Sequence, residues 1–202
     1  MNSLIGFLLD DSGSMKDSRK ATIDSFNEFL RVQQYREDDC AFYMAKFSML
    51  YTEMHKFVNI FKVPRLDISQ YDANGSDTAL WDAIIKLVEA MRQKIDALPD
   101  QQRPTNVTLV IQTDGQDGCS WGTTGDARQA VKRAQADGWH ILFLAKGSDG
   151  FYSAQALGID PTHIIRYDGT TTARAFAAAA GRVLESVVTG QMGTTPPKLG
   201  TE

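Results

Sequence analysis

Residues 4–14 read LIGFLLDDSGS, an apolar run followed at once by acidic and small polar residues. An unbroken apolar run is typical of a strand buried on both faces of a parallel sheet. Alternate residues after such a strand can turn toward one point, which brings together the carboxylate of Asp10 and the hydroxyls of Ser12 and Ser14. This oxygen set suits a hard cation such as Mg²⁺. Taken alone, the pattern is equally typical of a turn capped by its own side chains.

Two later segments place similar residues at the ends of elements. Residues 75–84 read GSDTALWDAI and put Thr78 at the start of an amphipathic helix. Residues 107–115 read VTLVIQTDG, a second buried strand that ends in Asp114. The carboxyl ends of parallel strands meet at one edge of a sheet, so these residues are expected to lie near the first cluster.

This ordered set of Asp-x-Ser-x-Ser, then Thr, then Thr-Asp-Gly resembles the von Willebrand factor A (VWA) domain and its metal-ion-dependent adhesion site (MIDAS). The resemblance covers residues 3 to 188. It implies that the two serine hydroxyls bind the metal directly, that the two aspartates hold its waters, and that the threonine binds directly or through water. The implied cation is Mg²⁺, with Mn²⁺ or Ca²⁺ as substitutes. The implied metal ligands are Asp10, Ser12, Ser14, Thr78 and Asp114.

Strand and helix patterns alternate along the chain, which predicts an α/β fold: an open, doubly wound, mostly parallel sheet of six strands with helices on both faces. The resemblance adds a Rossmann-like VWA strand order of 3-2-1-4-5-6. Only residues 48–50 separate the second and third strands, which predicts a hairpin and one antiparallel edge strand. Besides the two segments above, strands are expected at 40–47, 51–57, 139–145 and 163–167, and helices from about 18 and at 80–98, 126–137, 152–157 and 172–188.

Chain length predicts one domain, because 202 residues are too few for two domains with full cores. We assign residues 1–188 to the VWA domain. Residues 189–202 contain glycine, threonine and proline with few apolar residues, and they are expected to form a disordered tail. After the first strand and its loop, Ser18 or Asp17 is expected to cap the first helix.

Charge and cysteine usage limit the classes of partner. The net charge is −4 and no basic stripe occurs, which argues against nucleic-acid binding. No apolar run approaches a membrane span, and the chain enters its first strand without a signal-like segment, so we expect a cytoplasmic protein without membrane contact. Cys40 and Cys119 are predicted at opposite ends of the sheet, about 23 Å apart, and a disulfide needs Cα atoms within about 7 Å. We expect two free thiols.

Five residues near the motif allow more than one interpretation. Asp77 either caps the helix after Thr78 or adds charge near the metal, and the cap is preferred. Asp117 either sits in a solvated turn or binds a cation, and the turn is preferred. Asp11 is expected to bond neighbouring backbone, and Asp82 to be a surface or supporting carboxylate. Trp121 is either an exposed contact residue in a glycine-rich loop or is folded onto that loop.

Three enzyme classes share parts of this layout. A haloacid-dehalogenase-type phosphatase needs a second aspartate where Ser12 stands. A response-regulator receiver would use Asp10, Asp11 and Lys146, but it also needs an aspartate near residues 50 to 60, and none occurs there. A metal-dependent hydrolase needs a base, and no histidine falls on a loop expected near the site.

We therefore expect a non-enzymatic intracellular VWA domain that docks an Asp or Glu of a protein partner through its metal. The resemblance implies an ATPase, a kinase or a stress-response protein as partner. The alternative is a metal-dependent phosphatase or hydrolase on the same sheet.

Overall fold

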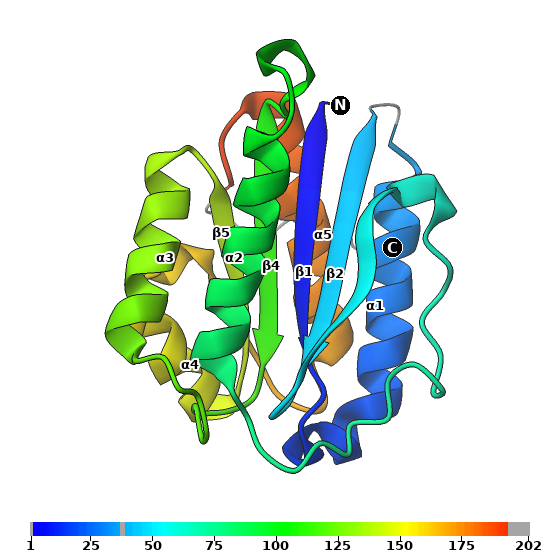
Figure 1. The fold of residues 1–202 in the computed structure, drawn as a ribbon. Helices are drawn as coiled ribbons and strands as arrows, with labels where there is room; N and C mark the ends of the chain where they lie inside the picture. Colours follow the sequence, from blue (N-terminus) through cyan, green and yellow to red (C-terminus); the bar gives the residue numbers. More distant parts are fainter. Residues whose placement is uncertain (1, 37–38, 194–202) are drawn as a thin grey trace.

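The computed structural model describes residues 2–36 and 39–193, which build one six-stranded sheet in the order β3-β2-β1-β4-β5-β6 (Figure 1). Neighbouring strands are parallel except β2 and β3, which form the antiparallel hairpin at one edge. The predicted fold class and strand order are confirmed. The strands are β1 (Ser3–Asp10), β2 (Cys40–Phe47), β3 (Tyr51–Asn59), β4 (Asn106–Thr113), β5 (His140–Lys146) and β6 (Ile164–Tyr167).

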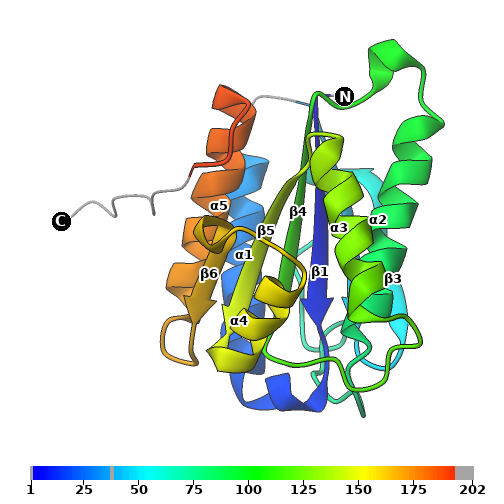
Figure 2. The same cartoon turned by 90° about the vertical axis from the view of Figure 1, so that its left-hand side faces the viewer.

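Helices cover both faces of the sheet, so that it forms the middle of three layers (Figure 2). Helices α1 and α5 pack together on one face, and α2 and α3 pack together on the other. Their bounds are α1 (Arg19–Gln34), α2 (Leu80–Asp96), α3 (Thr124–Ala136), α4 (Gly147–Ala156) and α5 (Thr172–Thr189). Short 3₁₀ helices lie at η1 (Gly13–Ser18), η2 (Ile60–Lys62), η3 (Asp100–Gln102) and η4 (Pro161–His163).

The central strand β1 is buried along its whole length, as its apolar run predicts. Its alternate side chains enter two separate cores, one on each face of the sheet. On the α1 side, Phe7 meets Phe26 and Phe29 edge to face, with ring centroids 5.0 Å and 5.3 Å apart. On the α2 side, Gly6 leaves room for Met91, whose sulfur would lie 2.3 Å from any added Cβ atom. This packing on both faces fixes the position of β1 between the helical layers, and with it the position of the residues that follow the strand.

The order in which strands are added to the sheet reverses at β1, which lies between β2 and β4. In doubly wound sheets, the loops on either side of such a switch point leave in opposite directions and open a crevice at the carboxyl ends of the strands. The segments after β1 and β4 therefore meet at one place, and these are the segments that carry Asp10 to Ser14 and Asp114.

The predicted and observed starts differ at several helices. Helix α3 begins at Thr124, two residues before the predicted start at 126. Helix α4 begins at Gly147, five residues before the predicted start at 152. The predicted cap of α1 by Ser18 is wrong, because Ser18 stands at the N-cap position but its side chain makes no capping hydrogen bond among the described residues. The 3₁₀ helix η1 continues directly into α1, and the Ser18 hydroxyl donates instead to the carbonyl of Met15, at 3.1 Å.

At the C-terminal end, α5 continues through Thr189, and the side chain of Met192 is buried in the core on the α1 and α5 face. The rest of the predicted tail, residues 194–202, lies outside the described residues. Among the helices that the structure describes, none is both long and apolar enough to cross a membrane.

Candidate metal centre

The side chain of Asp10 ends β1 with no exposed surface. Its Oδ1 accepts a hydrogen bond from the backbone N–H of Ser12 at 2.9 Å, and its Oδ2 accepts one from the hydroxyl of Thr113 at 2.5 Å. Thr113 is the last residue of β4, so the neighbouring strand orients the carboxylate. The main-chain carbonyl of Asp10 accepts from the Tyr71 hydroxyl at 2.8 Å. The carboxylate is therefore held rigidly at the switch point.

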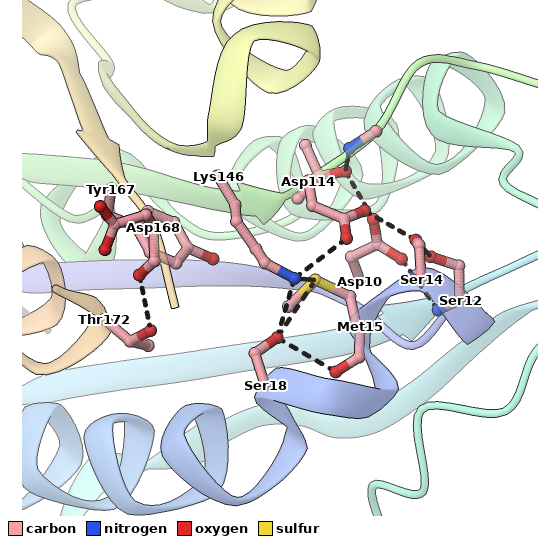
Figure 3. Close-up of polar contacts among 12 residues, drawn as sticks. Asp10, Ser12, Ser14, Met15, Ser18, Asp114, Lys146, Tyr167, Asp168 and Thr172 are labelled. Carbon is pink, nitrogen blue, oxygen red and sulfur yellow. Dashed lines mark hydrogen bonds and ion pairs between the residues drawn. The ribbon is translucent and has the colours of Figure 1, made fainter. Parts of the chain in front are cut away.

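A continuous chain of side-chain oxygen atoms runs from Ser12, in the segment after β1, to Asp114, the residue after β4 (Figure 3). The hydroxyl oxygens of Ser12 and Ser14 lie 3.0 Å apart, and the Ser14 hydroxyl donates to Oδ1 of Asp114 at 2.8 Å. Neighbouring ligands of an octahedral Mg²⁺ ion, each at about 2.1 Å, are separated by about 3.0 Å. The spacing and the chemistry of these oxygens therefore fit a small hard cation.

Burial is the main influence on the protonation of Asp10. It raises the pKa of this carboxyl from 3.8 to about 6, because the charged form loses its hydration. The hydrogen bonds from Ser12 and Thr113 oppose that rise, and the negative charge of Asp114 adds to it. A cation beside two carboxylates would favour their charged forms.

Thr78 lies on a segment that hydrogen-bonds to the loop after β1. Two main-chain hydrogen bonds make this link. The N–H of Gly13 donates to the carbonyl of Gly75 at 2.8 Å, and the N–H of Gly75 donates to the main-chain carbonyl of Asp11 at 3.0 Å. The N–H of Ala79 donates to the carbonyl of Ser48 at 2.8 Å. Within the described residues, the Thr78 hydroxyl makes no hydrogen bond to the other four predicted ligands. The structure thus joins Asp10, Ser12, Ser14 and Asp114 directly and places Thr78 on an adjoining segment.

The loop after Asp114 caps helix α2. Asp117 Oδ1 accepts from the N–H of Trp81 at 3.2 Å, and the Ser120 hydroxyl accepts from the N–H of Asp82 at 3.1 Å. The prediction of a solvated turn at Asp117 is therefore wrong. The predicted cap by Asp77 is also wrong, because α2 begins three residues later, at Leu80, and Asp77 accepts instead from the N–H of Thr78 at 2.8 Å.

A residue of helix α2 also accepts hydrogen bonds from this loop. The carboxylate of Asp82 accepts from the N–H groups of Trp121 and Gly122 at 3.0 Å and 2.9 Å, which makes it a supporting carboxylate, as expected. The Trp121 side chain is 97% exposed, which selects the exposed arrangement over the folded one.

Asp11 faces away from the oxygen chain, as predicted. Its Oδ1 accepts from the N–H of Ala73 at 2.7 Å, and its Oδ2 pairs with Lys46 at 2.8 Å. In the described part of the chain, no three His, Cys, Asp or Glu side chains gather in a way that could hold a metal. A metal centre here depends on serine hydroxyls together with two carboxylates.

Sequence reasoning missed two members of the cluster. Thr113 was read only as part of the Thr-Asp-Gly motif, although it donates to Asp10. Lys146 was considered only for a receiver, yet its Nζ lies 3.3 Å from Oδ2 of Asp114 and 3.1 Å from the Ser18 hydroxyl. The available signal was its place at the end of β5, the strand beside β4.

Solved structures share this fold at low sequence identity. The VWA domain of the type V pili tip protein Mfa5 from Porphyromonas gingivalis matches with a TM-score of 0.68 and 9% identity, covering 96% of this chain and 99% of that one. Manganese-loaded TRAP from Plasmodium vivax matches with a TM-score of 0.60 and 13% identity, covering 86% and 71%.

Proximal thread matrix protein 1 from the mussel byssus, solved with a zinc-occupied MIDAS motif, matches with a TM-score of 0.66 and 11% identity. That match covers 91% of this chain but 48% of the byssus protein, so the chain spans about half of its length. A scan of family models and a search of curated proteins found no match to the sequence. The comparisons show a VWA fold.

Proposed function

We propose that this VWA-fold domain binds one divalent cation at Asp10, Ser12, Ser14, Thr78 and Asp114, and uses it to dock a carboxylate of a protein partner. The oxygen chain from Ser12 through Ser14 to Asp114 carries the proposal, because it gathers two neutral hydroxyls and a carboxylate at hydrogen-bond distances, 3.0 Å and 2.8 Å, that neighbouring ligands on a small cation would also keep. The zinc-occupied motif of the byssus protein and the manganese-loaded TRAP protein support a divalent ion. We take Mg²⁺ as the ion in the cell, with Mn²⁺ or Ca²⁺ as substitutes.

The charges of the ligand set favour a carboxylate as the docking group. Asp10 and Asp114 together neutralise a divalent ion, while the serine and threonine hydroxyls add no charge. An ion held mainly by neutral hydroxyls and water stays electrophilic and accepts one more anionic oxygen. An Asp or Glu on a partner supplies such an oxygen. The pilus tip protein among the structural neighbours supports a role in protein interaction.

We also propose a cytoplasmic location and a class of partner. Cys40 and Cys119 are not joined to each other by a disulfide, which suits a reducing compartment and supports a cytoplasmic location. An ATPase, a kinase or a stress-response protein is the proposed class of partner, on the family resemblance given by the motif. We propose no catalytic role for the domain.

Calorimetric titration with MgCl₂ or MnCl₂ tests the metal ligands. The double variant Ser12→Ala with Ser14→Ala removes two hydroxyls and should weaken binding by at least about 10–100-fold, since even changes behind the ligands cost that much. Ser76→Ala is the matched control, because Ser76 is exposed and lies on the Thr78 segment. Equal affinity in the double variant and the control, with the fold intact by circular dichroism, would refute the assignment.

Water-proton relaxivity of the Mn²⁺-loaded protein tests carboxylate docking. Acetate should displace bound water and lower the relaxivity, whereas chloride at the same ionic strength should not. A relaxivity that acetate leaves unchanged would contradict the docking proposal. Metal-dependent hydrolysis of a phosphate monoester, lost in Asp114→Ala, would favour the hydrolase alternative instead.

A further inference from the structure

Lys146 places a positive charge against one of the proposed metal ligands. It is the last residue of β5, and its ammonium lies 3.3 Å from Oδ2 of Asp114. The same nitrogen donates to the Ser18 hydroxyl at 3.1 Å, so the side chain is held at both partners (Figure 3). The other oxygen of Asp114 accepts from Ser14. One carboxylate is thus shared between the oxygen chain and an ammonium group.

The surroundings of this ion pair strengthen it. The side chains of Lys146 and Asp114 are only 19% and 11% exposed. Ion pairs that are partly removed from water interact more strongly and are screened less by salt than pairs on an open surface. The pair is also the only one in the described residues that uses a predicted metal ligand; the pairs of Lys46 and Arg19 use Asp11 and Asp72.

The net charge of the centre follows from these contacts. Asp10 and Asp114 contribute two negative charges when ionised, and Lys146 cancels one of them. A divalent ion beside Asp114 meets repulsion from the ammonium, and this repulsion acts at a few ångströms even if the lysine keeps its position. If the lysine leaves instead, its contacts with Asp114 and Ser18 are lost. In both cases the lysine lowers the affinity of the site for a cation.

We propose that Lys146 is a built-in counterion that neutralises Asp114 in the metal-free domain and competes with the divalent cation. The inference rests on the proposed metal site and deepens it, because it names the residue that sets the affinity. The domain then keeps its site folded without metal and loads it only when the cation is abundant or when a partner carboxylate adds negative charge.

Calorimetric titration with MnCl₂ of Lys146→Met tests this role. Methionine keeps an unbranched apolar stem, in a side chain one heavy atom shorter than that of lysine, and removes the charge. We expect binding to become about tenfold tighter or more, the effect of removing one positive charge a few ångströms from a divalent ion. Lys146→Arg keeps the charge and should stay within about threefold of the parent protein.

The chain offers a matched control in Lys46→Met. Lys46 pairs with Asp11 at 2.8 Å, with side-chain exposures of 23% and 11%, close to those of the Lys146 pair, but Asp11 is no proposed ligand. Its removal should change the affinity by less than about threefold, since its partner lies outside the ligand set. Thermal unfolding gives a second readout: Lys146→Met should have a lower midpoint than the parent in chelator and a larger rise with MnCl₂.

The outcomes separate this inference from the proposed function. Binding by the parent protein with equal or weaker binding by Lys146→Met overturns the counterion role and leaves the metal site standing. Binding by Lys146→Met alone supports the counterion role. Absence of binding in every variant overturns the metal site and this inference together. If Lys146→Met fails to fold, Lys146→Gln replaces it under the same criteria.

Discussion

At the residue scale, the centre depends on side chains that orient one another. The motif residues Ser12, Ser14 and Asp114 could be predicted together, because their positions at strand ends follow from the sequence order. Thr113 and Lys146 could not be assigned, because a threonine before an aspartate and a lysine at a strand end are common and carry no spacing signal. Their roles arise from the lateral order of β4 and β5 beside β1. Only the folded sheet brings them to Asp10 and Asp114.

Thr113→Val tests the support of Asp10. The change removes the hydroxyl that donates to the buried carboxylate at 2.5 Å and accepts from the N–H of Gly115 at 3.1 Å. We expect a loss of about 1.5–3 kcal/mol of unfolding free energy at pH 7, the range for hydrogen bonds to charged groups. Urea unfolding in the presence of chelator measures it.

Thr108→Val is the control for that experiment. Thr108 is buried in the same strand, and among the described residues its hydroxyl meets only the neutral groups of Asn106 and Ser186, at 3.3 Å and 3.4 Å. Its loss should cost about 0.5–1.5 kcal/mol. A Thr113→Val variant that costs no more than Thr108→Val would show that Thr113 does not hold the Asp10 carboxylate.

At the element scale, the patterned helices and strands were predicted well, while helix starts were not. Helix α2 was recognisable from its apolar face, but its N–H groups are capped by Asp117 and Ser120, which lie more than thirty residues away in the chain. A cap that comes from a distant loop leaves no local signal. The sequence therefore favoured Asp77, the nearest acidic residue before the helix.

The turn before α5 is stabilised by hydrogen bonds to Asp168, and their contribution to stability should depend on pH. Asp168 Oδ1 accepts from the N–H and hydroxyl groups of Thr170 and Thr171 at 2.7–3.0 Å. These bonds, first those of the Thr170 and Thr171 side chains, lower the pKa of Asp168 from 3.8 to about 2. A lowered pKa stabilises the fold above pH 3.8, and this contribution is lost as the pH falls toward 2.

Asp168→Ala should therefore unfold more easily than the parent protein at pH 7, and the difference should shrink as the pH falls from about 4 to about 2. Unfolding midpoints measured across that range test the prediction. Asp149→Ala serves as the control, because Asp149 is exposed in the first turn of α4 and, within the part of the chain that the structure describes, accepts only a 3.4 Å contact from Ser148. A difference between Asp168→Ala and the parent that stays constant with pH would contradict the assigned hydrogen bonds.

At the scale of the whole molecule, the site follows from topology. The sheet reverses its winding at β1, so the loops after β1 and β4 meet, and two helical layers hold both strands at fixed heights. The alternation of strand and helix patterns was enough to predict this architecture. The contacts that the site residues make across strands could not be predicted from that alternation, because they depend on lateral contacts between strands far apart in sequence.

The most direct test is a crystal of the protein soaked in MnCl₂, with the anomalous signal of manganese recorded. We expect one peak at ligand distance from the hydroxyls of Ser12 and Ser14, beside Asp10 and Asp114, and the map will show whether Thr78 binds directly or through water. A peak elsewhere, or none at all with these oxygens still 2.8–3.0 Å apart, would contradict the metal site.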